Sequence, residues 1–215
     1  MHINNSDNTH FGWSDKTHRY ILSKVIQEFP KLKKYEEILK EFVVRPDYNE
    51  LGFVGNYHFY SPNTGRSFLD YNGRNNAYSR YLLHVKKMFE AISIKERDFK
   101  IMKHAGKALH FLQDMTQPHH SQQGFFFNKV IEVRTHINFE TFAEKKLDEF
   151  LKDLSQYTVE GKSVENIFAG NLTFASKTGI PTKANKEEWE RIARESIIQA
   201  VNSTREFLTN LNSRL

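Results

Sequence analysis

Apolar side chains recur every three or four residues along most of the chain. A clear example is the segment 15–29, whose apolar positions include Tyr20, Ile21, Val25 and Ile26. This spacing places them on one stripe of a helix, where they can be buried together. The same period returns later and predicts amphipathic helices over residues 15–29, 32–42, 76–91, 96–115, 136–154 and 186–211.

Two stretches between these segments lack the pattern. Residues 46–73 and 172–181 are rich in Gly, Pro, Asn and Ser, which is typical of loops. The first is unusually long, and long ordered loops in compact domains are often functional. The chain shows no internal repeat, low-complexity tract or strand-rich region. We therefore expect an all-α fold, a single compact helical bundle over residues 13–215, preceded by a flexible polar extension over residues 1–12.

The composition is ordinary for a globular protein with a hydrophobic core, since 39% of the 215 residues are hydrophobic and 27% are charged. No run approaches the roughly 20 apolar residues that span a bilayer. Residues 1–12 carry no apolar core of a signal peptide. If Met1 is the native start, the sequence predicts a cytoplasmic protein; otherwise an export signal has already been removed.

The formal charge of +5 favours phosphate-bearing partners, either nucleic acid or an anionic lipid surface. A solvated basic surface without any partner is equally compatible with it. Cysteine is absent, which excludes disulfides and thiolate ligands. Any bound metal would therefore use His, Asp and Glu, a nitrogen and oxygen ligand set that suits zinc.

The ten histidines are unevenly distributed. His110 and Asp114 are four residues apart in a predicted helix, and so are His136 and Glu140 in the next one, so each pair shares a helix face. Pairs of this kind from consecutive helices can converge in a bundle core and bind metal. Each pair alone is also compatible with an ordinary surface ion pair, and the spacing does not decide between the two.

The residues around these pairs resemble the bacterial zinc-dependent phospholipase C family. The run 110–120, His-Phe-Leu-Gln-Asp-Met-Thr-Gln-Pro-His-His, resembles its central motif, in which a ligand His follows the Asp by six residues. That rule selects His120 and leaves His119 beside the site. The run 136–144, His-Ile-Asn-Phe-Glu-Thr-Phe-Ala-Glu, resembles the matching downstream segment.

Three further motifs appear upstream in the order that the family has them. Residues 58–62, His-Phe-Tyr-Ser-Pro, resemble its His-Phe-Tyr-Asp-Pro loop, and residues 46–48 resemble the Pro-Asp-Tyr before that loop. Trp13 and His18 resemble the Trp at the mature N-terminus and the ligand His that follows it. The resemblance runs from Trp13 to Glu144, about two thirds of the chain.

The resemblance implies three zinc ions. The first would be bound by His58, His110 and Asp114, and the second by His120, His136 and Glu140. The third would be bound by His18, by Asp114 as a bridge, and by the amine and carbonyl of Trp13. Asp47 matches the acid proposed as the base for the attacking water. Tyr48 matches a tyrosine of the headgroup pocket, or packs on the core, and Phe53 is the nearest counterpart of a phenylalanine there.

Trp13 is internal in this sequence, so its peptide nitrogen has no free lone pair for a metal. We therefore expect cleavage between Gly12 and Trp13; if it does not occur, His10 or a water would fill the third site, giving an enzyme with two zinc ions or with a weakened third one. The five-residue interval from Trp13 to His18 is closer to fungal single-strand nucleases, which share the scaffold. The membrane-docking β-sandwich of some relatives has no counterpart in the sequence.

The expected function is a phospholipase C that hydrolyses glycerophospholipid to diacylglycerol and a phosphorylated headgroup. Its partners would be phospholipid and a membrane surface, with no obligate protein partner, and the resemblance implies an extracellular location. The alternative is a single-strand nuclease or nucleotidase on the same zinc scaffold. A third hypothesis is a metal-stabilised binding protein without turnover, against which an intact Asp47 argues.

Overall fold

The computed structural model describes residues 13–67, 70–121, 129–152, 158–180 and 185–215. For residues 53–55 and 129–134 it describes the backbone alone. The elements in chain order are α1 (Asp15–Ile26), α2 (Pro30–Lys33), α3 (Glu36–Phe42), α4 (Pro46–Asn49), the 3₁₀ helix η1 (Phe53–His58), α5 (Ala77–Ser93), α6 (Asp98–Asp114), α7 (Pro118–Ser121), α8 (Lys129–Lys145), α9 (Leu147–Phe150), α10 (Val164–Thr178) and α11 (Lys186–Asn212).

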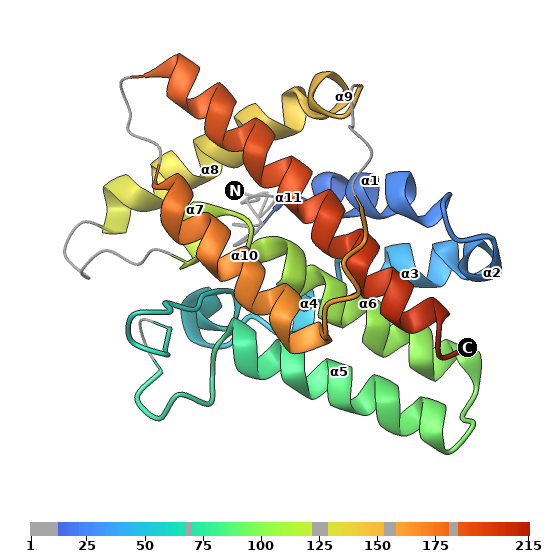
Figure 1. The fold of residues 1–215 in the computed structure, drawn as a ribbon. Coiled ribbons are helices and arrows are strands. Elements are labelled where there is room, and N and C mark those ends of the chain that lie inside the picture. The colour runs from blue at the N-terminus through green and yellow to red at the C-terminus, as the bar shows by residue number, and fades with distance from the viewer. Residues whose placement is uncertain (1–12, 68–69, 122–128, 153–157, 181–184) are drawn as a thin grey trace, which may run out of the picture.

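Helix α6 forms the centre of the bundle, with α11 crossing over it, α5 along one edge and α3 beside it (Figure 1). Every residue of α6 from Ala105 to Asp114 is buried. Gly106 allows α3 to pack closely, because a Cβ there would lie 2.8 Å from Phe42 Cβ and 3.1 Å from Leu39 O. The last turn of α6 is therefore held deep in the molecule.

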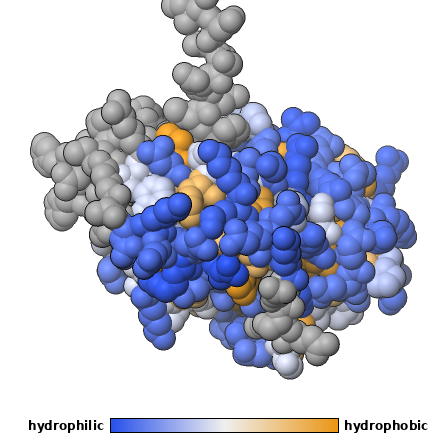
Figure 2. All heavy atoms as spheres, turned by 90° about the horizontal axis from the view of Figure 1, so that it is seen from above, coloured by the Kyte–Doolittle hydropathy of each residue, from blue (hydrophilic) through white to orange (hydrophobic). Residues whose placement is uncertain are grey.

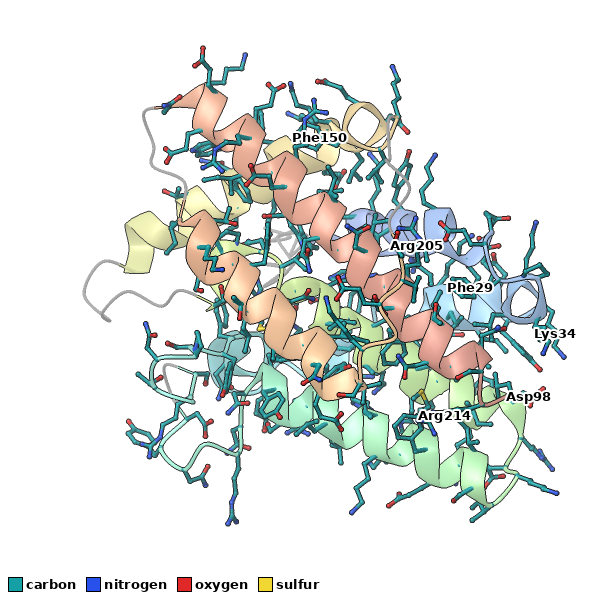
Figure 3. The ribbon with its side chains drawn as sticks, in the orientation of Figure 1. Phe29, Lys34, Asp98, Phe150, Arg205 and Arg214 are labelled. Carbon is teal, nitrogen blue, oxygen red and sulfur yellow. The ribbon has the colours of Figure 1, made fainter. Side chains whose placement is uncertain are left out.

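Local sequence signals fix where several helices begin. The Ser14 side chain accepts the backbone N–H of Thr17 at the start of α1. At the start of α5, Asn76 and Ser79 form a reciprocal capping box. On α11, Arg205 makes a bidentate ion pair with Glu28, just after α1, over 2.6 and 2.7 Å (Figure 3). This pair fixes α11 against the end of α1.

The predicted all-α fold is confirmed, and an isolated bridge between Ser61 and Arg66 is the only β pairing among the described residues. The loop predicted over 46–73 contains two short helical elements, α4 and η1. Helix α8 begins at Lys129, seven residues before the predicted start at His136.

The loop predicted over 172–181 is wrong for residues 172–178, which belong to α10. Its polar residues suggested a loop, but their hydroxyls are satisfied inside the helix: Thr173 donates to Ala169 O and Thr178 to Phe174 O. Phe168 and Leu172, four residues apart, are buried and supply its apolar face.

No helix in the described part of the chain is both long and apolar enough to cross a membrane. Figure 2 shows one face of the molecule, on which hydrophilic side chains predominate and hydrophobic ones lie between them. The described residues of this face present no broad apolar patch.

Candidate metal centre

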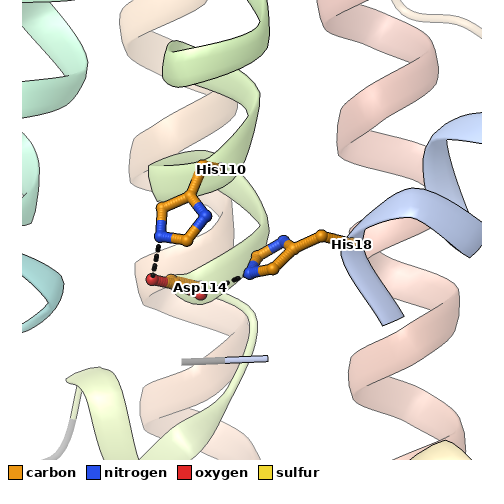
Figure 4. Close-up of side chains that lie close together, drawn as sticks. All are labelled: His18, His110 and Asp114. Atoms are coloured by element: carbon orange, nitrogen blue, oxygen red, sulfur yellow. Dashed lines mark ion pairs between the residues drawn. The ribbon is translucent and has the colours of Figure 1, made fainter. Parts of the chain in front are cut away.

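The last turn of α6 places two ligand-type side chains at the centre of the bundle. His110 and Asp114 share one face of α6, and His18 approaches Asp114 from α1 (Figure 4). His18 Nε2 lies 3.3 Å from Asp114 Oδ1, and His110 Nε2 lies 3.2 Å from Asp114 Oδ2. All three side chains are fully buried. Each oxygen of one carboxylate therefore faces an imidazole.

The long loop before α5 adds two residues to this centre. His58, the last residue of η1, has its Nδ1 3.0 Å from Asp114 Oδ2 and 3.0 Å from His110 Nε2. Asp47, in α4, has its Oδ1 3.6 Å from His110 Nε2 and 3.7 Å from His58 Nδ1. Both Asp47 oxygens are buried without a hydrogen-bond donor among the described residues. No donor among the described residues therefore holds this carboxylate, and its Oδ1 faces the His58 and His110 imidazoles.

A third group forms where α7 faces α8. His136 Nε2 lies 2.7 Å from Glu140 Oε1 and 3.0 Å from His120 Nε2. The Gln117 side-chain amide donates to the same Glu140 oxygen over 3.0 Å. His120 Nδ1 lies 4.0 Å from Asp114 Oδ2, so this group adjoins the one on α6.

Hydrogen bonds on the outer side of three imidazoles fix their tautomers. Nδ1 of His110 donates to Val43 O over 2.8 Å, and Nδ1 of His120 donates to His58 O over 2.7 Å. Nδ1 of His18 lies 2.7 Å from the side-chain oxygen of Gln113. With Nδ1 protonated, Nε2 of each ring carries a lone pair directed at the centre, the orientation found in metal-bound histidines.

Three sets of atoms are close enough to bind a cation. Within each set the ligand atoms lie within 4.8 Å of one another, and the sets are His18–His110–Asp114, Asp47–His58–His110 and His120–His136–Glu140. Lone pairs and carboxylate oxygens that face each other in a buried space repel unless a cation lies between them. The donors are imidazole nitrogens and carboxylate oxygens, so the residues fit zinc.

Burial and neighbouring charges shift the protonation of this centre. Burial raises the pKa of Asp47 well above its usual range, and the nearby Asp114 carboxylate raises it further, although His18 opposes both. Burial alone would also raise the pKa of Asp114, but His110 and His120 outweigh it and hold that pKa well below its usual value.

The other carboxylate of the centre, Glu140, has a pKa of about 7, because burial disfavours its charged form. Burial lowers the pKa of His110 to about 4 and that of His136 to about 4. These two imidazoles are therefore neutral near pH 7, which is the protonation state that a metal requires.

Trp13 completes the centre from the side of α1. Its backbone N–H donates to Asp114 Oδ1 over 3.3 Å. The buried indole fixes this position, since its Nε1 donates to Gln113 O over 3.2 Å and to Thr116 Oγ1 over 3.3 Å. All eight residues predicted as metal ligands therefore lie together around the last turn of α6.

Of the other residues named from the sequence, Tyr48 and His119 lie beside the candidate metal centre. Phe53 and His10 have side chains outside the part that the structure describes. Tyr48, half exposed, donates its hydroxyl to Asp15 Oδ2 over 2.7 Å. His119 stacks on His136 with ring centroids 5.0 Å apart and contacts the Gln117 side chain rather than the centre. Residues 1–12 as a whole also lie outside the described part.

Two glutamines beside the centre, Gln113 and Gln117, were not predicted from the sequence. Gln113 lies against His18 and Gln117 against Glu140. Both are polar residues within the 110–120 motif and both are fully buried. The sequence feature that could have identified them is a glutamine within a motif of predicted ligands. A buried amide is almost always hydrogen-bonded, so such a glutamine is expected to contact a neighbouring ligand.

The sequence of this chain matches a profile described as zinc dependent phospholipase C over residues 17–200. The chain belongs to the zinc-dependent phospholipase C family. The matched segment includes all the ligand-type residues above except Trp13. No curated protein matches the chain.

Solved structures of this fold agree with the family. The alpha toxin of Clostridium absonum matches with a TM-score of 0.72 and 16% identity, over 97% of this chain and 65% of that one. The alpha-toxin of an avian strain of Clostridium perfringens matches with a TM-score of 0.64 and 17% identity, over 96% of this chain and 65% of that one. The chain therefore shares their fold and spans slightly less than two thirds of their length.

Proposed function

We propose that this member of the family is a zinc-dependent phospholipase C that hydrolyses a glycerophospholipid to diacylglycerol and a phosphorylated headgroup. The observation that carries the proposal is the convergence of three buried histidine–carboxylate groups around Asp114. Family membership supports the choice of reaction. Neither the family profile nor the two toxin structures favours the nuclease alternative.

Each residue has a role in this proposal. His58, His110 and Asp114 would hold one zinc, and His120, His136 and Glu140 a second, with Asp47 beside the first. Bound zinc supplies a Lewis acid that lowers the pKa of a coordinated water from about 16 to about 7. Asp47 accepts the proton of the attacking water, since its oxygens lack a donor among the described residues. The water oxygen would form a bond to phosphorus, the bond between phosphorus and the diacylglycerol oxygen would break, and that leaving oxygen would take up a proton from Asp47 or solvent.

We propose a third zinc at His18, Asp114 and Trp13, which requires a free amine at Trp13. A peptide nitrogen is conjugated and cannot bind metal, whereas an α-amine with a pKa near 8 can. The Trp13 nitrogen already lies 3.3 Å from Asp114 Oδ1. Cleavage before Trp13 would supply the amine, and such processing is compatible with an extracellular enzyme. A chain beginning at Trp13 should bind one more zinc than the full chain, and equal stoichiometry, affinity and rate would contradict this.

We propose that Tyr48 lines the headgroup site, with Phe53 as its second aromatic residue. Tyr48 follows Asp47 in α4, so its ring is one residue from the proposed base, and it is 51% exposed. An exposed aromatic face beside the Asp15 carboxylate would suit a cationic headgroup.

The decisive assay compares two substrates for one enzyme. Release of phosphocholine from short-chain phosphatidylcholine is measured beside hydrolysis of single-stranded DNA, both in zinc-containing buffer. We expect lipid cleavage that is lost on chelation and restored by zinc. The Asp47→Asn variant should lose lipid cleavage, whereas the surface variant Asp148→Asn should retain it. Cleavage of DNA without cleavage of lipid would overturn the proposal.

A further inference from the structure

A chain of buried hydrogen bonds connects the centre to α11. The Gln113 side-chain oxygen lies 2.7 Å from His18 Nδ1, and its amide nitrogen donates to Thr204 Oγ1 over 3.0 Å. Gln113, His18 and Thr204 are all fully buried. Thr204 lies beyond residue 200, where the family profile ends.

The direction of these bonds determines which nitrogen of His18 is protonated. An amide oxygen can only accept, so His18 Nδ1 carries a proton, which leaves Nε2, on the side of Asp114, as the nitrogen that would bind a metal. If the amide were reversed, its N–H groups would face Nδ1 instead. Nδ1 would then accept, the proton would move to Nε2, and the lone pair at the metal position would be lost.

Thr204 bonds the end of the Gln113 amide that faces away from His18. Its hydroxyl oxygen accepts from the Gln113 amide nitrogen and thereby directs the amide oxygen to His18. Its own position is secured by the next residue, because Arg205 is bound to Glu28 by two hydrogen bonds of 2.6 and 2.7 Å. Helix α11 therefore presents Thr204 at a fixed register to α1 and α6.

We propose that Thr204, acting through Gln113, is a positioning residue that holds His18 in the tautomer able to bind zinc. The inference rests on the proposed zinc site at His18. Thr204 touches neither metal nor substrate, and its effect passes through two hydrogen bonds. Residues that orient a metal-bound histidine in this way typically change metal affinity by about 10- to 100-fold when they are removed.

The test compares Thr204→Val with Thr204→Ser. Valine keeps the shape and removes the acceptor, whereas serine keeps the acceptor. We expect Thr204→Val to weaken the binding of one zinc by about 10-fold in competition with a chelator. The remaining zinc should bind as in the wild type, and Thr204→Ser should retain near wild-type affinity. Ser203→Ala, which removes a buried hydroxyl bonded only within α11, is the matched control and should change nothing.

Two further measurements separate positioning from damage to the fold. In a Gln113→Leu background, which removes the connection, Thr204→Val should cause no additional loss of zinc affinity. Nitrogen NMR of the chelator-treated protein should show the Nδ1–H of His18 hydrogen-bonded in the wild type, and this bond weakened in Thr204→Val, whether or not Nε2 also carries a proton towards Asp114. If the wild type bound no zinc at this site, the zinc assignment would be refuted. The NMR comparison would still test whether Thr204 positions His18. An unchanged Nδ1–H hydrogen bond and wild-type affinity in Thr204→Val, or equal losses in the serine and valine variants, would overturn the proposal.

Discussion

Two largely buried groups of histidine and carboxylate both adjoin the Phe111 ring, and they are built differently. The ring centroid of Phe111 is 5.5 Å from that of His58 in the metal centre. It is 6.2 Å from that of His84, which belongs to a second group that we call the Glu50 network: Glu50, His84, His104 and Lys107. The residue types are similar, but the source of positive charge differs.

The Glu50 network contains its own cations. The Lys107 ammonium donates to Glu50, and His84 Nε2 lies 2.9 Å from the other Glu50 oxygen. Burial would raise the pKa of Glu50, but His84 and Lys107 outweigh it and lower that pKa to about 2. His84 Nδ1 in turn contacts His104 Nδ1 over 3.1 Å. The carboxylate is thus neutralised by side chains of the protein.

Among the described residues, no lysine or arginine pairs with a carboxylate of the candidate metal centre. Asp47 has no hydrogen-bond donor there, and burial raises its pKa well above the usual range. A buried carboxylate that the protein does not neutralise requires either a proton or an external cation. Lys107 neutralises Glu50 within the protein, whereas the carboxylates of the candidate metal centre would be neutralised by a bound zinc ion.

The largest effect should follow from Asp114→Asn. Each oxygen of Asp114 faces a different imidazole, so its loss should weaken two zinc sites at once. We expect activity to fall on the order of 10³-fold or more and zinc content to drop. Activity against short-chain phosphatidylcholine and elemental analysis measure the two effects. Full zinc content in this variant would refute the shared role of Asp114.

Asp47→Asn should reduce turnover by about 10²-fold or more, the usual loss for a positioned base. Its melting temperature should stay nearly unchanged, because asparagine keeps the shape and burial already disfavours the charged form of Asp47 by raising its pKa. Turnover at saturating substrate and thermal unfolding are the measurements. Wild-type turnover would show that Asp47 is not the base.

Glu140→Gln should stabilise the chelator-treated protein at pH 8 and not at pH 4. The pKa of Glu140 is raised from 4.5 to about 7 in the fold. Its contribution to stability is therefore present below pH 4.5 and is lost as pH rises through 7. The shift corresponds to roughly 3 kcal/mol at pH 8. Denaturant unfolding at both pH values measures it, and a destabilised variant at pH 8 would contradict the account.

Lys107→Met should give the smallest effect on function. It removes the ammonium from the Glu50 network and leaves Glu50 with His84. We expect a loss of about 2 kcal/mol in unfolding free energy, since a mostly buried pair is broken. Zinc content should be unchanged. If zinc were lost in this variant while stability held, the two groups would not be separate.

The sequence predicted which ligand-type side chains lie close together better than it predicted their surroundings. Motif resemblance and helical spacing identified His110, Asp114, His136 and Glu140, because i,i+4 pairs on a helix determine their own geometry. Asp47 was expected only as a base, and its approach to His58 and His110 depends on how α4 and η1 fold within the long loop. Such packing between distant segments leaves no periodic signal in the chain.

Contacts between helices that are distant in the sequence could not be predicted from it either. The bond between Gln113 and Thr204 joins residues 91 positions apart on two helices. Helix α10 was missed because its hydroxyl-rich segment resembles a loop until its buried apolar face is known. Amphipathic helices with a clear period, such as α5, α6 and α11, were predicted within two residues at each end.

Zinc content tests the central claim most directly. The full chain, dialysed in zinc-containing buffer and then freed of loose metal, is analysed for zinc per polypeptide, with Asp114→Asn beside it. We expect two or three zinc ions per wild-type chain and fewer in the variant, because each of the three groups around Asp114 brings its ligand atoms within 4.8 Å of one another. Less than one zinc per wild-type chain would contradict the account.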